Sequence, residues 1–376
     1  MDFASLLRLV ESRDASDLFL CAGAAPTIKV KQELHPLSTH HLSSHQVEHI
    51  LQLIASPQQL SQFNQTAELN FAFEHNPTSR YRISAFRQRN LPAIILRRID
   101  PIIPSTEQLQ LKAIYSDLAL QRQGLVLIVG STGSGKSTSL AAMIHHRNQQ
   151  QRGHIISVED PIEFIHPSEK SIVSQREVGQ DTQSYEIALK NALRQAPDMI
   201  VIGEIRDRAS MQLALQAART GHLCIATLHA NNCQQALERI PLFFDPGERE
   251  SVLFDLSNSL KALIAQRLIP VYKQKQQQLI NEIVLNTSLV SSLIRNQNLG
   301  QIKTVIEKSK PLGMLSFEDE LYNLVTQKQI LADHALKLAD HETELRLKLK
   351  LNGFLETCTS TPELKIDFSE PQKKAS

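Results

Sequence analysis

The chain has 376 residues, 41% of them hydrophobic, and it is longer than a single hydrophobic core usually serves. Forty Lys and Arg balance 39 Asp and Glu, so the near-zero net charge argues against broad electrostatic binding to DNA or to an anionic membrane. The four cysteines stand singly, which suggests neither a disulfide framework nor a zinc knuckle. The first residues carry acids where a secretory signal carries bases, and no apolar run reaches about 18 residues, so we expect a cytoplasmic protein without a membrane span.

The first hundred residues show helical and strand patterns in turn. Phe3, Leu6, Leu7 and Val10 recur at the spacing of one helix face, and the apolar run that begins at Asp17 has the length of a strand. Later patterns predict a strand over 27–34, a helix over 42–54, and strands over 70–73 and 81–86. Together these elements predict a small α+β domain over residues 1–100.

A second domain is expected after a linker at 101–112, because the segment from Asp100 holds two prolines and no periodicity. From residue 113 onward, apolar strands alternate with amphipathic segments, which indicates an α/β fold with a mostly parallel sheet. The predicted strands are Leu125–Val129, Ile155–Val158, Met199–Ile202 and Leu223–Thr227.

The end of the chain is expected to be helical. Beyond Pro270 we predict a polar loop at 272–278, then helices that complete a domain over 113–350, and a disordered polar tail at 351–376. One stretch departs from this pattern, because leucines alternate strictly with basic residues over 345–351, which is the period of a strand. A solvated face on a terminal element is favoured there over a membrane-facing or partner-facing surface.

A glycine-rich loop follows the first strand of the second domain. Residues 130–138 have the sequence GSTGSGKST, and a helix is expected to begin near Lys136. Glycines let backbone N–H groups point toward a phosphate, and the helix adds the positive end of its dipole. Lys136 would reach the β- and γ-phosphates, and the Ser137 hydroxyl would hold Mg²⁺. The residues predicted to bind ATP are Gly130, Ser131, Thr132, Gly133, Ser134, Gly135, Lys136, Ser137 and Thr138.

Acidic residues follow two other predicted strands. Glu159, Asp160 and Glu163 come near the end of one strand, although acids in this position could equally cap a helix. Glu204 follows the strand at 199–202, where P-loop enzymes keep the carboxylate that faces Mg²⁺ and water, and Gly203 stands where that carboxylate is usually an Asp. Because the carboxyl ends of parallel strands meet at one edge, we expect these acids beside the phosphate loop.

Two pairs of histidines have the side-chain type of metal ligands. His222 and His229 flank one strand at an odd separation that places their rings on opposite faces, so they cannot share an ion. We interpret them as a hydrogen-bonding sensor of the phosphate and a strand-end contact. His45 and His49 lie one helical turn apart, but nothing nearby completes a site, and a solvated helix face is favoured.

Arginines are concentrated near the end of the first domain, at positions 80, 82, 87, 89, 97 and 98. Such a cluster with aromatic neighbours could bind single-stranded nucleic acid. Alternatively, the arginines could point at the ATP of a neighbouring subunit. The near-zero net charge favours the second interpretation, and we expect no nucleic-acid partner.

At these motifs the chain resembles the secretion-superfamily ATPases of type II secretion and type IV pili, the GspE/PilT-like family. The segment that begins LRQAPD at Leu193 matches the family signature, and GSTGSGKST, VEDPIEF and the two histidine segments occur in the family's order. The resemblance covers residues 2–350 and implies a PAS-like first domain followed by a RecA-like motor domain that assembles as a hexameric ring.

Within that family, the chain is similar to the pilus retraction ATPases, because it lacks the long N-terminal extension and the C-x-x-C zinc element of the assembly motors. The segments that start at His154, Leu193 and Gly221 are more similar to the accessory retraction motor than to the principal one. Gln195 and Ala196 stand where the principal motor usually has an acidic pair.

The resemblance also implies residue roles and partners. Lys136 and Ser137 would hold phosphate and Mg²⁺, Glu163 would act as the general base, and Glu204 would organise metal and water. His222 and His229 would couple the γ-phosphate to movement. The remaining implied contacts are in-trans contacts of Arg82 and Arg97 with the nucleotide.

The expected protein is an ATP-hydrolysing hexamer at the inner-membrane base of a type IV pilus, which promotes pilus retraction and twitching motility. Its expected partners are the principal retraction ATPase and the inner-membrane platform protein. Two alternatives stay open from the sequence. One is a weakly hydrolysing ring partner of the principal motor, and the other is a nucleic-acid translocase built on the same core.

Overall fold

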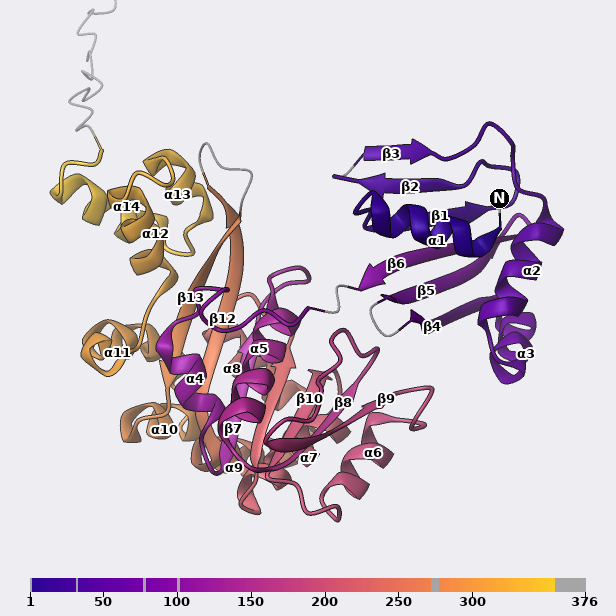
Figure 1. The fold of residues 1–376 in the computed structure, drawn as a ribbon. Helices are drawn as coiled ribbons and strands as arrows, with labels where there is room; N and C mark the ends of the chain where they lie inside the picture. Colours follow the sequence, from indigo (N-terminus) through magenta and orange to yellow (C-terminus); the bar gives the residue numbers. More distant parts are fainter. Residues whose placement is uncertain (1, 32, 77–78, 100–101, 272–276, 356–376) are drawn as a thin grey trace, which may run out of the picture.

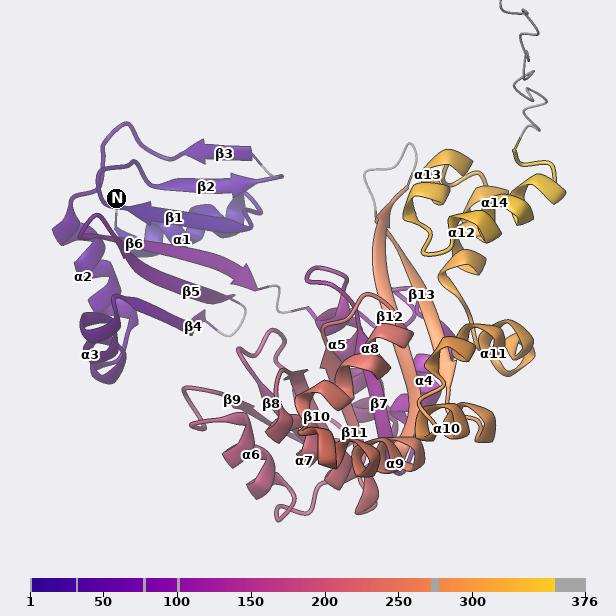
Figure 2. The ribbon, with the colours of Figure 1, turned by 180° about the vertical axis from the view of Figure 1, so that it is seen from behind.

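Two β-sheets organise the molecule, one on each side of residue 102 (Figures 1 and 2). The computed structural model describes residues 2–31, 33–76, 79–99, 102–271 and 277–355. No helix in these ranges is both long enough and apolar enough to cross a membrane.

The first sheet is antiparallel and has six strands in the order β3-β2-β1-β6-β5-β4. Its strands are β1 (Asp17–Cys21), β2 (Thr27–Val30), β3 (Glu33–Pro36), β4 (Glu68–Asn76), β5 (Ser79–Gln88) and β6 (Leu91–Ile99). Three helices accompany them: α1 (Phe3–Ser12), α2 (Ser44–Ile54) and α3 (Pro57–Thr66). The buried faces of these helices and strands form one hydrophobic cluster, as expected for an α+β unit.

Local sequence explains where these helices begin. The Ser43 hydroxyl accepts a hydrogen bond from the Gln46 N–H, and the Gln46 side chain accepts one from the Ser43 N–H, a reciprocal cap that starts α2. Ser56 and Gln59 repeat this arrangement at the start of α3, where Pro57 occupies the first helical position.

The second sheet has seven strands in the order β13-β12-β7-β11-β10-β8-β9. The strands are β7 (Gly124–Val129), β8 (Gly153–Glu159), β9 (Ser171–Glu177), β10 (Met199–Ile205), β11 (Leu223–Leu228), β12 (Leu260–Pro270) and β13 (Gln277–Leu285). Every neighbouring pair is parallel except β12 and β13. The carboxyl ends of β7, β8, β10 and β11 therefore meet at one edge of the sheet.

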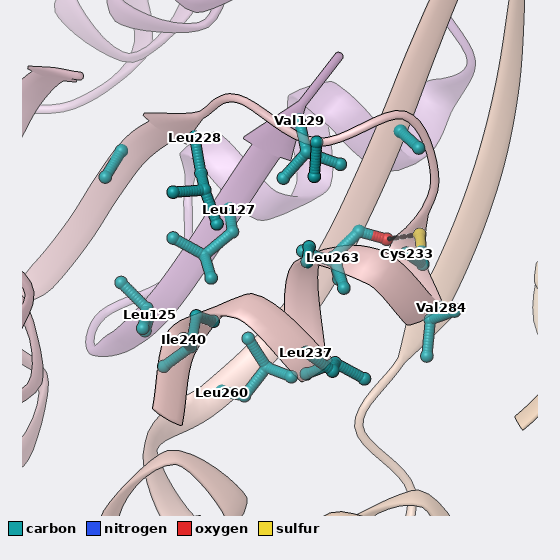
Figure 3. Close-up of a cluster of buried hydrophobic side chains, with 14 of the residues drawn as sticks. Leu125, Leu127, Val129, Leu228, Cys233, Leu237, Ile240, Leu260, Leu263 and Val284 are labelled. Atoms are coloured by element: carbon teal, nitrogen blue, oxygen red, sulfur yellow. Dashed lines mark hydrogen bonds between the residues drawn. The ribbon is translucent and has the colours of Figure 1, made fainter. Parts of the chain in front are cut away.

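Helices cover both faces of this sheet. One face carries α4 (Ala113–Ala119) and α5 (Lys136–Gln150), and the other carries α6 (Tyr185–Ala192), α7 (Arg208–Arg219), α8 (Cys233–Arg239) and α9 (Arg249–Ser259). Figure 3 shows part of the second interface, where Leu125, Leu127 and Val129 of β7 pack toward Leu237 and Ile240. Both faces of β7 are buried, which fixes the position of the loop that follows it.

The C-terminal part of the second unit is mainly helical (Figure 1). Its helices are α10 (Ser288–Arg295), α11 (Ile302–Lys308), α12 (Phe317–Thr326), α13 (Ala332–Leu338) and α14 (Glu342–Leu351). Short 3₁₀ helices lie at Ile240–Phe243, Pro246–Glu248, Leu299–Gln301 and Lys310–Leu312.

The structure corrects three predictions of secondary structure. The single strand expected over 27–34 is two antiparallel strands, β2 and β3, because β2 ends at Val30 and β3 begins at Glu33. The region after Pro270 is not helical throughout, because β13 returns antiparallel to β12 and includes two residues of the expected polar loop. Positions 272–276 of that loop, and positions 356–376 of the expected tail, lie outside the described residues.

The third correction concerns residues 345–351, which form the helix α14 rather than a strand. In a helix, leucines two positions apart point to nearly opposite faces. Accordingly, Leu345 and Leu349 are fully buried in the core, whereas Leu347 and Leu351 are exposed. Leu, Lys, Arg and Glu all favour helices, and this preference together with the burial of one face prevails over the alternating pattern.

Candidate active site

The phosphate loop connects β7, in the middle of the sheet, to the first turn of α5. The Lys136 ammonium donates hydrogen bonds to the carbonyl oxygens of Gly130 and Ser131, at 2.8 Å each. Gly135 caps the helix with φ +87°, a left-handed conformation that favours glycine. The loop is thus folded back around its own lysine at the N-terminus of a helix, where anions bind.

Gly130 is the most confined of the three glycines of this loop. A Cβ atom built on it would lie 2.2 Å from Ser134 Oγ and 2.7 Å from the backbone oxygen of Gln266 in β12. A side chain at this position is therefore excluded unless the loop and β12 move apart. The Ser134 hydroxyl is buried, and it has no hydrogen-bond partner among the described residues.

A cavity of about 550 Å³ opens beside the loop at the carboxyl edge of the sheet. From the loop and α5 it is lined by Thr132, Gly133, Gly135, Lys136, Ser137 and Thr138. Its other polar lining residues include Glu159, Asp160, Glu163, Glu204, Arg206 and Arg82. The predicted loop, the predicted acids and one predicted arginine therefore surround the same space. Gly130, Ser131 and Ser134 support the loop from behind rather than lining the cavity.

Two carboxylates across the cavity affect the pKa of Lys136. Burial lowers the pKa of Lys136, while the carboxylates of Glu204 and Glu163 partly restore it. Glu204 itself is ion-paired with Arg206, which also lies 3.1 Å from Asp160. A site with a lysine, an arginine and several carboxylates suits a highly charged anion that arrives with a divalent cation.

Glu159 fastens the segment that carries Glu163. Its carboxylate accepts hydrogen bonds from the Ser157 hydroxyl at 2.7 Å and from the Gln175 amide at 3.2 Å, as well as from the Glu163 N–H. Burial raises the pKa of Glu159, and these hydrogen bonds offset only part of the shift. Glu159 therefore holds the segment that carries Glu163 in place and does not cap a helix. Glu163 remains to face the cavity.

Gly203 stands in a crowded position of β10. A Cβ atom there would lie 3.2 Å from both the Tyr185 hydroxyl oxygen and the Glu159 Cα, so even a small side chain would force its neighbours to shift. Tyr185, which lines the cavity, fills the place where an aspartate at 203 would extend. This packing explains why Glu204, one residue further along, is the acid available to the site.

The two arginines predicted to reach the nucleotide lie in different surroundings. Arg82 lines the cavity of its own chain. Arg97 lies opposite Arg82 on the neighbouring strand β6. It forms an ion pair with Asp17 at 2.9 Å and is not among the residues that line the cavity. Arg80, Arg87 and Arg98 also form ion pairs, with Glu177, Glu48 and Asp14, so much of the positive charge in this cluster is already compensated.

The structure separates the two predicted histidines. Leu228 of β11 pairs with Val129 of β7, so His229 lies at the edge that carries the phosphate loop, with an exposed side chain. His222 lies at the opposite end of the strand, where its carbonyl oxygen accepts the Gly124 N–H at 3.0 Å. A strand of this length spans roughly 20 Å. Within one chain His222 therefore lies too far from the phosphate loop to contact a phosphate held there, and its predicted role in coupling stays a prediction.

Sequence reasoning missed several residues of the cavity. Tyr185, His166 and Leu268 line it from α6, the segment after β8 and strand β12. His166 is almost fully buried, and its Nδ1 atom has no hydrogen-bond partner among the described residues. Tyr185 and Leu268 reach the cavity only through the packing of distant segments, whereas His166 lies three positions after Glu163 in the segment that follows β8.

The residues that face the loop fit a magnesium ion by their chemistry. Ser137 offers a hydroxyl oxygen and Glu204 a carboxylate oxygen, both ligand types that Mg²⁺ prefers, in a cavity that also has room for phosphates. In the described ranges, the cavity included, no group of three or more His, Cys, Asp or Glu side chains is arranged to hold a metal ion.

Comparisons with known proteins agree with this geometry. The family model "Type II/IV secretion system protein" matches residues 57–335. The chain is 46% identical to the type IV pilus ATPase PilU of Pseudomonas aeruginosa, over 99% of this chain and 98% of that protein. It is 36% identical to the type IV pilus retraction ATPase PilT of the same organism, over 90% of this chain and 98% of that protein.

A solved structure supports the same assignment. A crystal structure of the pilus retraction motor PilT with bound ADP superposes with a TM-score of 0.86 at 32% identity, and the match covers 92% of this chain and 99% of that one. The α/β fold with a RecA-like ATPase domain is thus confirmed, and so is the resemblance to retraction ATPases and to PilU in particular. The chain belongs to the type II/IV secretion system protein family, in its branch of type IV pilus ATPases.

Proposed function

We propose that this protein hydrolyses ATP in the cavity between the phosphate loop and the acids of β8 and β10, and that hydrolysis drives type IV pilus retraction and twitching motility. The observation that carries the proposal is the convergence of Lys136, Glu163, Glu204 and Arg82 on one cavity at the carboxyl edge of the sheet. Its similarity to proteins named PilU and PilT supports the pilus as the target.

In this proposal the chain's own residues bind and orient the triphosphate. Lys136 exchanges its two carbonyl partners for oxygens of the β- and γ-phosphates, and the N–H groups at the start of α5 donate to the same phosphates. Magnesium, held by Ser137 and Glu204, would neutralise charge on the phosphates. Glu163 accepts the proton of the attacking water, with its backbone fixed through Glu159.

We further propose that six copies form a ring and that the chain divides into a PAS-like domain at 1–100, a linker at 101–112 and a motor domain at 113–350. A ring would let Arg82, and Arg97 if its ion pair opens, approach the nucleotide of a neighbour. His229, at the phosphate edge, would transmit the state of the γ-phosphate. The principal retraction ATPase and the inner-membrane platform protein are the proposed partners, at the cytoplasmic base of the pilus.

ATP turnover of purified variants tests the proposal. Replacing Lys136 with Ala should abolish detectable turnover, because it removes the ammonium from the phosphates, and Glu204→Gln should lower turnover at least tenfold. The control is Glu186→Gln, which removes a carboxylate on α6 that is ion-paired with Lys190 and does not line the cavity.

Two outcomes would count against this function. Turnover of Lys136→Ala equal to the wild type would show that the cavity is not the hydrolytic site. Turnover that appears only after the principal retraction ATPase is added would instead support a weakly hydrolysing ring partner.

A further inference from the structure

A buried ion pair joins the first domain to the motor domain. Arg80, in β5, places its Nη2 atom 2.7 Å from Oε2 of Glu177, the last residue of β9. The side chains are 16% and 3% exposed, so this pair is far less accessible to water than a typical surface salt bridge. The pair therefore links the two units directly at their contact.

The same carboxylate also holds the segment that carries Glu163. Glu177 Oε2 accepts the backbone N–H of Ile162 at 3.1 Å, and Ile162 directly precedes Glu163. The other oxygen, Oε1, accepts a hydrogen bond from the Gln180 side chain. Arg80 therefore reaches the segment of the proposed general base through one intervening side chain.

The other hydrogen bonds that hold this segment come from within the motor domain. Gln175 donates to the Phe164 carbonyl oxygen at 2.8 Å and accepts the His166 N–H at 2.8 Å. Glu159 accepts the Glu163 N–H. The hydrogen bond from Ile162 differs from these, because its acceptor, Glu177, also pairs with Arg80 of the first domain.

Strand β5 supplies a second residue on the same side. Arg82 lies two positions after Arg80, and residues two apart in a strand point to the same face. Arg82 lines the nucleotide cavity, whereas Arg80 pairs with the carboxylate behind it. One face of β5 thus contributes Arg82 to the nucleotide cavity and Arg80 to the carboxylate that holds the segment of Glu163.

We infer that Arg80 is a positioning residue for hydrolysis. It orients Glu177, which in turn fixes the Ile162 N–H and thereby holds Glu163 toward the attacking water only while the first domain is docked on β9. This inference rests on the proposed function of Glu163. Its consequence is that separation of the two domains slows hydrolysis without removing any residue from the phosphate loop.

Steady-state ATPase kinetics test this role with Arg80→Ala and Glu177→Gln. We expect each change to lower kcat at least fivefold, while the affinity for a fluorescent ADP analogue stays within twofold of the wild type, because neither residue belongs to the phosphate loop. Arg80→Lys, which retains the charge, should recover most of the lost turnover. The matched control is Arg87→Ala, in the same strand, whose ion pair with Glu48 stays inside the first domain.

A double-mutant cycle with Glu163→Gln separates positioning from a general loss of stability. If Arg80 acts through Glu163, adding Arg80→Ala to Glu163→Gln should lower kcat by less than a further twofold. Hydrogen exchange of the peptide 158–166 gives a readout independent of activity, and it should be faster in Arg80→Ala and Glu177→Gln than in the wild type and in Arg87→Ala.

The possible failures are distinguishable. If Lys136→Ala or Glu163→Gln retains full turnover, the proposed function fails. If those variants are inactive but Arg80→Ala and Glu177→Gln match the wild type, or if their losses multiply fully with that of Glu163→Gln, the positioning role of Arg80 is overturned while the proposed function stands.

Discussion

His166 is an uncharged imidazole at the wall of the nucleotide cavity. Only 6% of it is exposed, and burial, with a smaller contribution from the neighbouring His145, lowers its pKa from 6.5 to about 4. An imidazole in the unfolded chain takes up a proton near its ordinary pKa of about 6.5. Between these two pKa values the unfolded state binds more protons than the folded state, so stability must fall as the pH falls.

We expect this histidine to make the protein sensitive to mild acid. From pH 7 to pH 4.5 the wild type should lose about 2 kcal/mol of unfolding free energy more than a His166→Gln variant, since glutamine takes up no proton. Urea unfolding at several pH values measures the difference. An exposed histidine provides the control, because His41→Gln should follow the wild-type profile. Parallel profiles for the wild type and His166→Gln would contradict the assignment.

At the residue scale, local chemistry determined what the sequence could predict. The phosphate loop is a continuous segment whose glycines and lysine act together, so its place was predictable, and Glu163 and Glu204 followed from the rule that parallel strands end at one edge. The ion pair of Arg80 with Glu177 joins residues 97 positions apart, and no local pattern indicates it. His222 and His229 flank β11 as predicted, but the motif does not tell which of the two ends carries the phosphate loop.

Helix α14 shows how an alternating pattern can mislead at the scale of a single element. Its leucines would share one face in a strand, but in the helix Leu345 and Leu349 are buried while Leu347 and Leu351 are exposed. The acidic residues Glu342 and Glu344 in its first turn and lysines in its last turn also suit the helix dipole.

Alanine substitutions distinguish the helix from a strand. Leu345→Ala should cost about 2–4 kcal/mol of unfolding free energy, because it opens a cavity in the core, whereas Leu347→Ala should change it by less than about 0.5 kcal/mol. Chemical denaturation of the two variants measures this contrast. Equal losses for both would mean that the leucines share one environment, as in a strand.

Other elements escaped prediction for a related reason. Strand β9 lies at an edge of the sheet and alternates poorly, since most of its residues are only partly buried. Strands β12 and β13 pair antiparallel, but a strongly apolar segment such as Leu260–Pro270 fits a buried helix as well as a buried strand. Their register depends on partners elsewhere in the chain, which composition does not reveal.

At the scale of the whole molecule, the cavity draws on both domains, because Arg82 lines it together with the phosphate loop. A ligand that fills the cavity would contact both units and would stabilise the arrangement in which they are docked. In a ring, the docking of each chain would also constrain its neighbours.

Native mass measurement tests the assembly. We expect a particle of about 250 kDa, six times the 42.2 kDa chain, whose population increases with ATP in the Glu204→Gln variant, because that variant should retain the nucleotide. The Lys136→Ala variant serves as the comparison, since ATP should not change its distribution. A particle of one or two chains at all protein concentrations, with and without ATP, would exclude the proposed ring.

The close approach at Gly130 has a mechanical consequence. Since one added carbon would lie 2.7 Å from the Gln266 oxygen, there is no clearance between the loop and β12. The Gln266 side chain donates hydrogen bonds to the Tyr115 and Ser139 hydroxyls at 2.7 Å each, which ties β12 to α4 and α5 as well. A movement of the loop toward β12 would therefore displace the β12–β13 hairpin, so a change at the phosphates would be passed to this hairpin through Gly130.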